Sequence, residues 1–346
     1  ALLGMKVDFF YVLLGLAVWR CPFSRTERDQ LITILMAGAF ITAAFGLLQQ
    51  RIGTFGLRDI GYEFDETIRT TGDSVLRSFS TFVQPFPFAF YLVMVVALAT
   101  PVALADMTRP RNRIFLATSP ILFLAVLGTF VRAALAALIM AALYLHATGY
   151  RRVAAVVPFM IVTALIVPTS LRASTLSATS LGQRLDGWSA VADTVVDHPF
   201  GVGIGTTGAA AERLVDEGAE VPETFGLPSN QLPYQPDNYY VKRLLELGLP
   251  GLWLTVTMLV HVIGSTVRQR ERADPADVAF VDGATAFFLG AVGAALFANY
   301  WEIFPLDLYF WITLGALTSI ERHGSPTAHS PSKPAEVGFK HTLAVS

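Results

Sequence analysis

Charged residues are scarce in this sequence, and their scarcity sets the class of protein. Asp, Glu, Lys and Arg make up 15% of the 346 residues, whereas hydrophobic residues make up 53% and the mean hydropathy is +0.52. Soluble globular domains carry about 25% charged residues, so the composition excludes that class. The aromatic content of 12% fits a protein that presents rings to lipid and to its interfaces. These values predict a polytopic membrane protein.

Cysteine and clustered histidine are also lacking. The single cysteine, Cys21, excludes an intrachain disulfide bond. The six histidines fall on separate elements or near the C-terminal end, and none form a cluster with the spacing of metal ligands. We therefore expect no metal and no other cofactor, and no nucleic-acid partner. Ala1 opens inside an apolar run, which suggests that N-terminal sequence is missing.

Nine apolar runs are long enough to cross a bilayer as helices, which takes roughly 17 to 25 residues. They cover residues 2–19, 31–49, 82–105, 114–129, 131–148, 153–168, 240–263, 278–298 and 304–320. The fourth run is short and contains Pro120, so its limits are the least sharp. We expect an all-α fold with about nine transmembrane helices.

Arginines are concentrated in alternate connections between these runs. Four connections carry eleven arginines in about 36 residues, whereas the others carry seven Lys or Arg in about 100 residues. Because Lys and Arg mark cytoplasmic loops, the arginine-rich connections are expected to face the cytoplasm and the others to face outward. The eleven are Arg20, Arg25, Arg28, Arg109, Arg111, Arg113, Arg151, Arg152, Arg268, Arg270 and Arg272.

The longest outward connection divides the chain. Residues 169–239 form a large extracytoplasmic loop between transmembrane groups at residues 1–168 and 240–320. Residues 321–346 follow as a tail rich in Ser, Pro and His, and it has too few apolar residues to pack. We expect this tail to be disordered in the cytoplasm.

The 169–239 segment combines an amphipathic helix with a glycine-rich turn. The turn at 201–208 contains four glycines, which let the backbone approach a neighbour closely. It is compatible with a binding loop or with a tight re-entry turn beside the bilayer. The helix is predicted to lie on the membrane surface and to end near His198-Pro199. Its apolar residues recur at three- and four-residue spacing: Leu185, Trp188, Val191, Ala192 and Val195.

The same segment is acidic. It holds three arginines against nine Asp and Glu, a sum of -6, which excludes a diffuse basic funnel for an anionic ligand. A phosphate-bearing substrate would have to be held by individual arginines in bidentate contacts.

Two polar residues stand at the outer ends of apolar runs. Arg132 lies at the outer end of two adjoining apolar runs. There its guanidinium would either contact protein, water or an anion, or extend to the lipid headgroups. Asp237 precedes Asn238, and the two resemble a helix start. Asp237 is therefore either a cap or a carboxylate that takes a proton from an attacking hydroxyl.

These features together resemble the O-antigen ligase and polymerase superfamily of bacterial envelope glycosyltransferases. The resemblance runs from about Ser78 to Leu317. It rests on STFVQPFPFAFYL (80–92), GTFVRAALAALI (128–139), GQRLDGWSAV (182–191), HPFGVGIGT (198–206) and DNYYVKRLLELGLPGL (237–252). Each motif alone is weak evidence for the family, but their occurrence in this order on the predicted outer side is specific to it. The family often has a histidine where this chain has Asp237.

The resemblance implies a fold like that of the C-type glycosyltransferases in the bacterial plasma membrane, with the active face extracytoplasmic. The enzyme would transfer a glycan from a polyprenyl-diphosphate carrier to a hydroxyl of a glycan or lipid-linked acceptor, without a metal. It implies catalytic roles for Arg132, Arg184 and Asp237. The substrate-binding residues it implies are Trp188, Gly203, Gly205, Asn238 and Tyr239. The alternatives are a transporter or flippase of lipid-linked precursors, and a non-catalytic assembly subunit.

Overall fold

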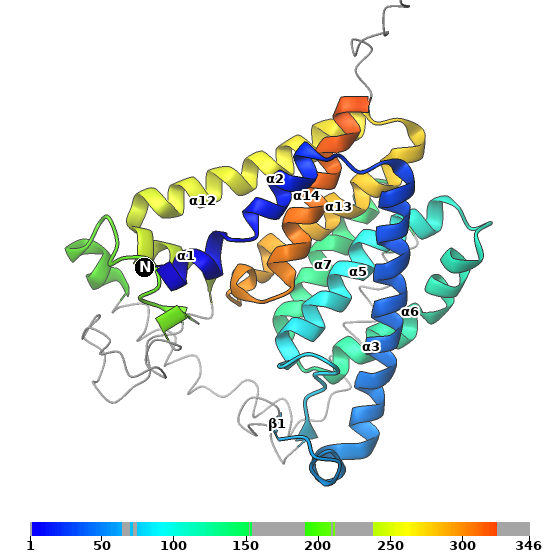
Figure 1. The fold of residues 1–346 in the computed structure, drawn as a ribbon, viewed down its shortest axis with the longest axis horizontal. Coiled ribbons are helices and arrows are strands. Elements are labelled where there is room, and N and C mark those ends of the chain that lie inside the picture. Colours follow the sequence, from blue (N-terminus) through cyan, green and yellow to red (C-terminus); the bar gives the residue numbers. More distant parts are fainter. Residues whose placement is uncertain are drawn as a thin grey trace, which may run out of the picture.

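The computed structural model describes residues 2–63, 70–71, 75–151, 153, 191–208, 210–211 and 238–323. These residues form a bundle of long helices with one short two-stranded ribbon (Figure 1). In chain order the elements are α1 (Leu2–Phe9), α2 (Val12–Arg20), α3 (Arg25–Asp59), β1 (Thr70–Thr71), β2 (Val75–Leu76), α5 (Pro85–Ala105), α6 (Pro110–Gly128), α7 (Arg132–Ala147), α12 (Tyr239–Arg272), α13 (Pro275–Ala294), η2 (Tyr300–Glu302) and α14 (Leu306–His323).

Helix starts follow local sequence signals. A reciprocal capping box opens α3, because the Ser24 hydroxyl accepts from the Glu27 amide while the Glu27 carboxylate accepts from the Ser24 amide. The helices α5, α6 and α13 each begin with proline, at Pro85, Pro110 and Pro275. Proline suits the first helical position, where its missing N–H would have no intrahelical partner.

The predicted spans agree with the described helices in most of the chain. Five of these helices, α3, α5, α6, α12 and α13, are long and apolar enough to cross a membrane, while α7 and residues Leu306–Thr318 of α14 are shorter apolar helices. The single span expected at residues 2–19 is wrong, because Phe10 and Tyr11 form a turn between α1 and α2. Apart from residue 153, the span expected at 153–168 lies outside the described residues, as do Arg184, Trp188 and Asp237.

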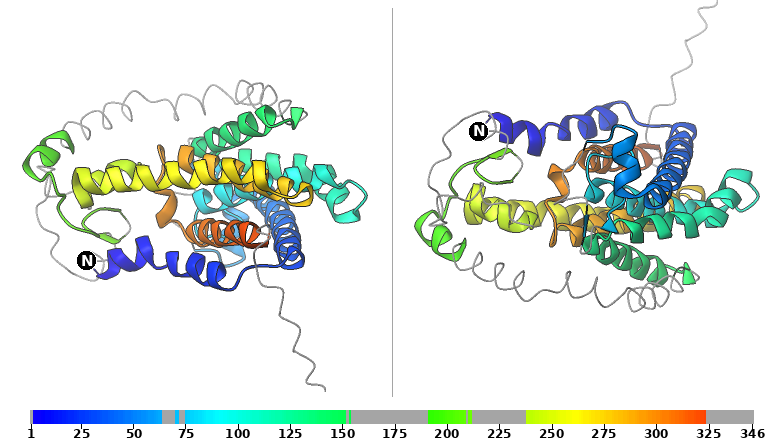
Figure 2. Two further views of the ribbon diagram at one scale, coloured as in Figure 1. Left: turned by 90° about the horizontal axis from the view of Figure 1, so that it is seen from above. Right: turned by 90° about the horizontal axis from the view of Figure 1, so that it is seen from below.

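Small residues let the central helices approach closely. In the most apolar stretch of α13, 78% of the residues are buried, and this helix packs along α5 and α7. Gly283 lies against the backbone carbonyl of Leu98 in α5, and Gly290 lies against that of Ala137 in α7. Close backbone approach at small residues is the usual packing of membrane helices. Figure 2 shows α7 on one side of the bundle and α1 with α2 on the other, where Gly15 of α2 contacts Trp311 of α14.

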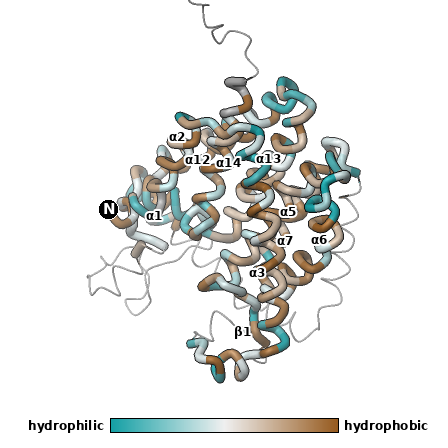
Figure 3. The backbone as a smooth tube through the Cα atoms, turned by 45° about the vertical axis from the view of Figure 1, so that its right-hand side comes forward, coloured by the Kyte–Doolittle hydropathy of each residue, from teal (hydrophilic) through white to brown (hydrophobic). Residues whose placement is uncertain are grey.

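The contacts define two ends of the bundle. Helix α7 runs antiparallel to α13, because Tyr144 contacts Asp282 near the start of α13 whereas Ala137 faces Gly290 near its end. Helix α5 is likewise antiparallel to α13. The starts of α5 and α7 therefore lie at the end where α13 finishes. Figure 3 shows hydrophobic residues along the helices and hydrophilic ones mostly in connecting segments.

Predicted cytoplasmic arginines gather at the other end of the bundle. Arg25 and Arg28 at the start of α3 pair with Asp277 at the start of α13. Arg109 near the start of α6 pairs with Asp29 of α3. These ion pairs bring the starts of α3, α6 and α13 together at one end of the bundle. The prediction that the arginine-rich connections lie on the same side is confirmed for these three. We call this the arginine-rich end; the side of the membrane that it faces stays a prediction.

Gly283→Ala tests the close approach of α5 and α13. A Cβ at this position would clash with the Leu98 carbonyl oxygen, and overpacking of this kind costs about 1–3 kcal/mol. We expect a clearly lower thermal unfolding midpoint for the purified variant in detergent. Gly264→Ala is the matched control, because its Cβ would meet only the tip of Arg268 at 3.4 Å. Equal midpoints for the two variants would contradict this packing.

Candidate active site

Arg132 is the first residue of α7 and lies at the end opposite the arginine-rich end. The preceding turn holds it in place: the Thr129 hydroxyl donates to the Val126 carbonyl at 2.6 Å and accepts from the Val131 amide at 3.2 Å. Phe130 adopts a positive φ of 55°, an uncommon backbone conformation for a bulky residue. Arg132 itself is exposed. The turn therefore presents its guanidinium at the surface of the bundle.

Arg77 lies beside Arg132, although 55 positions separate them in the sequence. Its Nε donates to the Thr129 carbonyl at 3.2 Å, and its guanidinium lies over the Phe86 ring at 5.1 Å. The pKa of Arg77 is lowered from its usual value, first by burial and then by the positive charge of Arg132. Two like-charged guanidinium groups thus share this corner of the bundle. The sequence interpretation missed Arg77, and the only signal for it was its position three residues before the STFVQPF segment.

The contact between Arg77 and the α6–α7 turn is supported by a second set of hydrogen bonds. The Ser78 amide donates to the Gly128 carbonyl at 2.8 Å, and Gln50 Nε2 donates to the same carbonyl at 3.0 Å. Gln50 Nε2 also donates to the Ser78 hydroxyl at 3.0 Å. These bonds fasten the segment that carries Arg77 to both α3 and the α6–α7 turn.

The predicted amphipathic helix is described only at residues 191–197, and it ends before His198 as expected. Val191 and Val195 belong to a small hydrophobic cluster with Val241 and Leu245 of α12. This part of the apolar face therefore contacts protein, whereas the sequence predicted that it would lie on the membrane surface.

The glycine-rich turn wraps around a break in α12. Gly248 interrupts that helix with a φ of 67°, and the Leu249 amide donates to the Pro199 carbonyl at 3.0 Å. The amides of Val202 and Gly203 donate to carbonyls of α12 at 2.9 and 3.0 Å. A Cβ on Gly201, whose φ is 84°, would clash with the α12 backbone. The prediction of close backbone approach is confirmed, and the neighbour is α12.

Four charged side chains are buried where this turn meets α12. Lys242 Nζ lies 2.9 Å from Glu246 Oε2 and 2.9 Å from Glu302 Oε1, and all three side chains are at most 3% exposed. Arg243 Nη1 lies 3.7 Å from Glu246 Oε2. Two cations and two anions balance, as burial of charge requires. We call Lys242, Arg243, Glu246 and Glu302 the buried charge cluster.

Glu246 joins this cluster to the glycine-rich turn. Its Oε1 accepts hydrogen bonds from the Gly205 amide at 2.9 Å and from the Thr207 hydroxyl at 3.2 Å. The buried charge cluster was missed in the sequence, where Lys242, Arg243 and Glu246 were part of a quoted motif without a role. The helical spacing of Lys242 and Glu246, four residues apart, was the available signal.

The remaining predicted site residues are placed as follows. Asn238 is the N-cap of α12, and its Oδ1 accepts from the amides of Tyr240 and Val241 at 3.0 and 3.2 Å. The Tyr239 hydroxyl is bound by Arg243 Nη2 at 2.6 Å, and its ring lies 4.8 Å from that of Trp301. Gly203 is exposed, whereas Gly205 is buried. Their roles in substrate binding stay predictions.

The two parts of the site lie at the same end of the bundle. The Tyr239 amide donates to the Ala295 carbonyl just after α13, and the ring of Tyr300 lies 5.2 Å from Phe90 near the start of α5. Near this contact, Trp301 Nε1 and Asn299 Oδ1 have no hydrogen-bond partner in the described part of the chain. Among the described residues, no group of three or more His, Cys, Asp and Glu is placed to hold a metal.

Glu246→Gln tests the buried charge cluster. The change keeps the shape of the side chain but leaves two cations against one anion, and breaking a buried ion pair costs about 3–5 kcal/mol. We expect a large loss of thermal stability in detergent. Glu271→Gln, at an exposed position on the same helix, should leave the midpoint unchanged. A Glu246→Gln variant as stable as Glu271→Gln would mean that the cluster contributes nothing.

One known protein family matches the part of the chain that contains Arg132 and the glycine-rich turn. A search among curated proteins finds no match. A family model described as O-antigen ligase matches residues 117–256, which extend from within α6 to the middle of α12. The matched region includes Arg132, the glycine-rich turn and Glu246. The resemblance read from the sequence is thereby confirmed over residues 117–256, which are similar to the O-antigen ligase family, and the long apolar helices agree with a multi-pass membrane protein.

Proposed function

We propose that this protein is a glycosyltransferase that moves a glycan from a polyprenyl diphosphate to an acceptor sugar hydroxyl, by ligation or polymerisation. The observation that carries the proposal is the O-antigen ligase match, which contains Arg132 at an exposed helix start. The bacterial plasma membrane is the proposed location, with the Arg132 end on the outer side. The low arginine content of the connections at this end supports that orientation.

The proposed role of Arg132 is to bind the diphosphate and stabilise it as it leaves. A guanidinium group binds phosphate oxygens through paired N–H donors and keeps its charge. Arg77 adds a second cation beside it, which suits a leaving group with two phosphates. Arg184 is proposed as a third contact on the basis of its motif. The arginines would thereby oppose negative charge as it develops, which is a large source of rate acceleration.

The proposed reaction is a single displacement at the anomeric carbon of the donor glycan. The acceptor oxygen forms the new bond to this carbon while the bond to the diphosphate oxygen breaks, and the leaving diphosphate takes the electron pair. Asp237 is proposed to accept the proton of the acceptor hydroxyl. The next residue, Asn238, caps α12 four residues before Lys242 of the buried charge cluster. The cap and the cluster both support a defined position for the start of this helix.

The Arg132→Ala variant tests the leaving-group contact. We expect glycan transfer to fall about 10²–10³-fold, the size of effect seen when a charge-stabilising donor is lost. The assay supplies purified protein in vesicles with a lipid-linked oligosaccharide and an acceptor glycan, and follows product length. Arg113→Ala, exposed at the arginine-rich end, should retain full activity. Unchanged product lengths in Arg132→Ala would contradict the proposal, and movement of intact lipid across the vesicle without transfer would indicate a flippase.

Asp237→Asn tests the proposed base. Loss of general-base catalysis lowers kcat by about 10²–10⁴-fold, with little effect expected on the KM for the donor lipid. Asp193→Asn is the matched control, because Asp193 is exposed on the helix before the glycine-rich turn. Equal kcat values for the wild-type protein and Asp237→Asn would assign Asp237 a capping role or none.

A further inference from the structure

A cavity of about 450 Å³ opens at the arginine-rich end, far from the candidate active site along the bundle. It lies between the starts of α3, α6 and α13 and the end of α5. Arg25, Arg28, Arg109 and Arg111 line it, against Asp29, Asp106 and Asp277. Its lining therefore carries one net positive charge.

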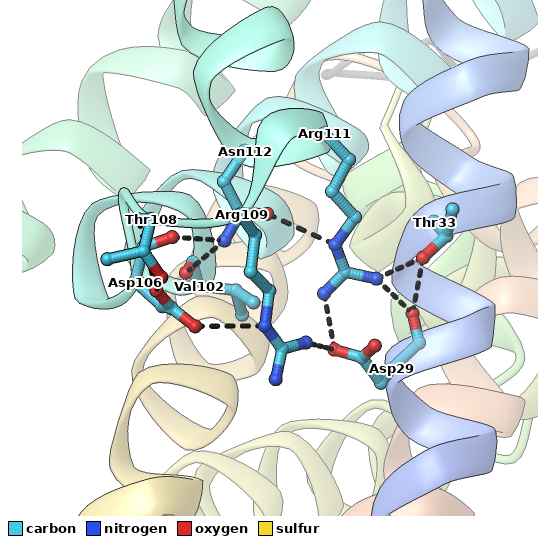
Figure 4. A network of polar contacts seen from close by, with 8 residues as sticks. All are labelled: Asp29, Thr33, Val102, Asp106, Thr108, Arg109, Arg111 and Asn112. Atoms are coloured by element: carbon cyan, nitrogen blue, oxygen red, sulfur yellow. Dashed lines mark hydrogen bonds and ion pairs between the residues drawn. The ribbon is translucent and has the colours of Figure 1, made fainter.

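Ion pairs fix two of these arginines to α3 and to the α5–α6 turn, as Figure 4 shows. Arg109 Nη1 lies 2.7 Å from Asp29 Oδ1, and Arg109 Nε lies 2.9 Å from Asp106 Oδ2. Arg111 pairs with the same Asp29 carboxylate and donates to the Asp29 carbonyl at 2.8 Å. The carboxylates thus orient both guanidinium groups at the rim of the cavity.

The α13 side of the cavity is built in the same way. Asp277 binds Arg28 at 2.8 Å and Arg25 at 3.0 Å. Arg28 is nearly buried, whereas the side chains of Arg25 and Arg109 remain 56% and 50% exposed. In the described part of the chain, Arg25 Nη1 and Arg109 Nη2 form no hydrogen bond or ion pair. Arg25 also pairs with Asp274, so each of these two arginines has two carboxylate partners. Each can donate to a further anion without losing them.

The inner wall of the cavity is apolar and lies at the expected edge of the hydrocarbon. It includes Ile32, Val102 and Phe280. Ile32 lies at the start of the apolar run 31–49, and Val102 lies near the end of the run 82–105. The cavity thus combines cationic donors at its rim with an apolar wall at the depth where lipid headgroups begin.

We propose that this cavity binds the phosphodiester headgroup of an anionic phospholipid from the adjoining leaflet. Arg25 and Arg109 would contact the phosphate oxygens, and the first carbons of the acyl chains would lie against Ile32 and Val102. Basic pockets between membrane helices bind anionic headgroups in this way. A bound headgroup would connect α3, α6 and α13 at the point where their ion pairs meet. This inference does not depend on the proposed glycosyl transfer.

The test measures thermal unfolding of the delipidated full-length protein in detergent during titration with defined lipids. Phosphatidylglycerol should raise the midpoint, whereas phosphatidylcholine with the same acyl chains should not. Arg25→Gln and Arg109→Gln should each weaken phosphatidylglycerol binding about fivefold, the effect of one cation near an anionic headgroup. Arg113→Gln is the matched control, since Arg113 is exposed on α6 and does not line the cavity.

Three results would overturn the proposal. Equal stabilisation by phosphatidylglycerol and phosphatidylcholine would exclude recognition of the anionic headgroup. An Arg113→Gln variant that loses as much binding as Arg109→Gln would indicate diffuse charge in place of a site. Stabilisation by soluble glycerol phosphate to the same extent would identify a free phosphate ligand and exclude the lipid. If a glutamine variant unfolds, Arg25→Lys and Arg109→Lys keep the charge, and they should still bind less well because the planar fork is lost.

Discussion

Charge that is buried in an apolar helix bundle must be neutralised where it lies, and this requirement shapes both ends of the molecule. At the arginine-rich end, Asp277 binds the nearly buried Arg28 of α3. At the other end, Glu246 and Glu302 enclose Lys242. An unpaired charge in these places would cost several kcal/mol. The pairs between elements therefore join α3 to α13 at one end and α12 to η2 at the other.

The glycine-rich turn and the break in α12 form one structural unit. The GVGIG sequence and the ELGLPG sequence are separated by about 40 residues, yet Gly201 and Gly248 meet with no room for a side chain on either. Both have positive φ angles, of 84° and 67°, which only glycine adopts without strain. Glu246 then binds the amide of Gly205 from within α12. The turn is thereby held against α12, whose N-cap Asn238 follows the proposed base in the sequence.

Local features of the sequence predicted local features of the structure. Apolar length located α5 and α13, because a helix across a membrane must be apolar along its whole length. The break at Phe10 and Tyr11 was missed, since the composition stays apolar through it. Arg77 and Glu302 were missed for a different reason: each acquires its partner only when distant segments fold together.

Arg77 and Arg132 carry like charges in one corner of the bundle, and their mutual repulsion is a physical reason why an anion would bind between them. Burial and the neighbouring positive charge both lower the pKa of Arg77, so each disfavours its charged form. A diphosphate placed between the two groups would convert this repulsion into attraction and would raise the pKa again. The hydrogen bond from Arg77 to the Thr129 carbonyl fastens Arg77 to the turn that precedes Arg132. Two like charges in one corner of the bundle would therefore suit the proposed diphosphate leaving group better than a neutral sugar.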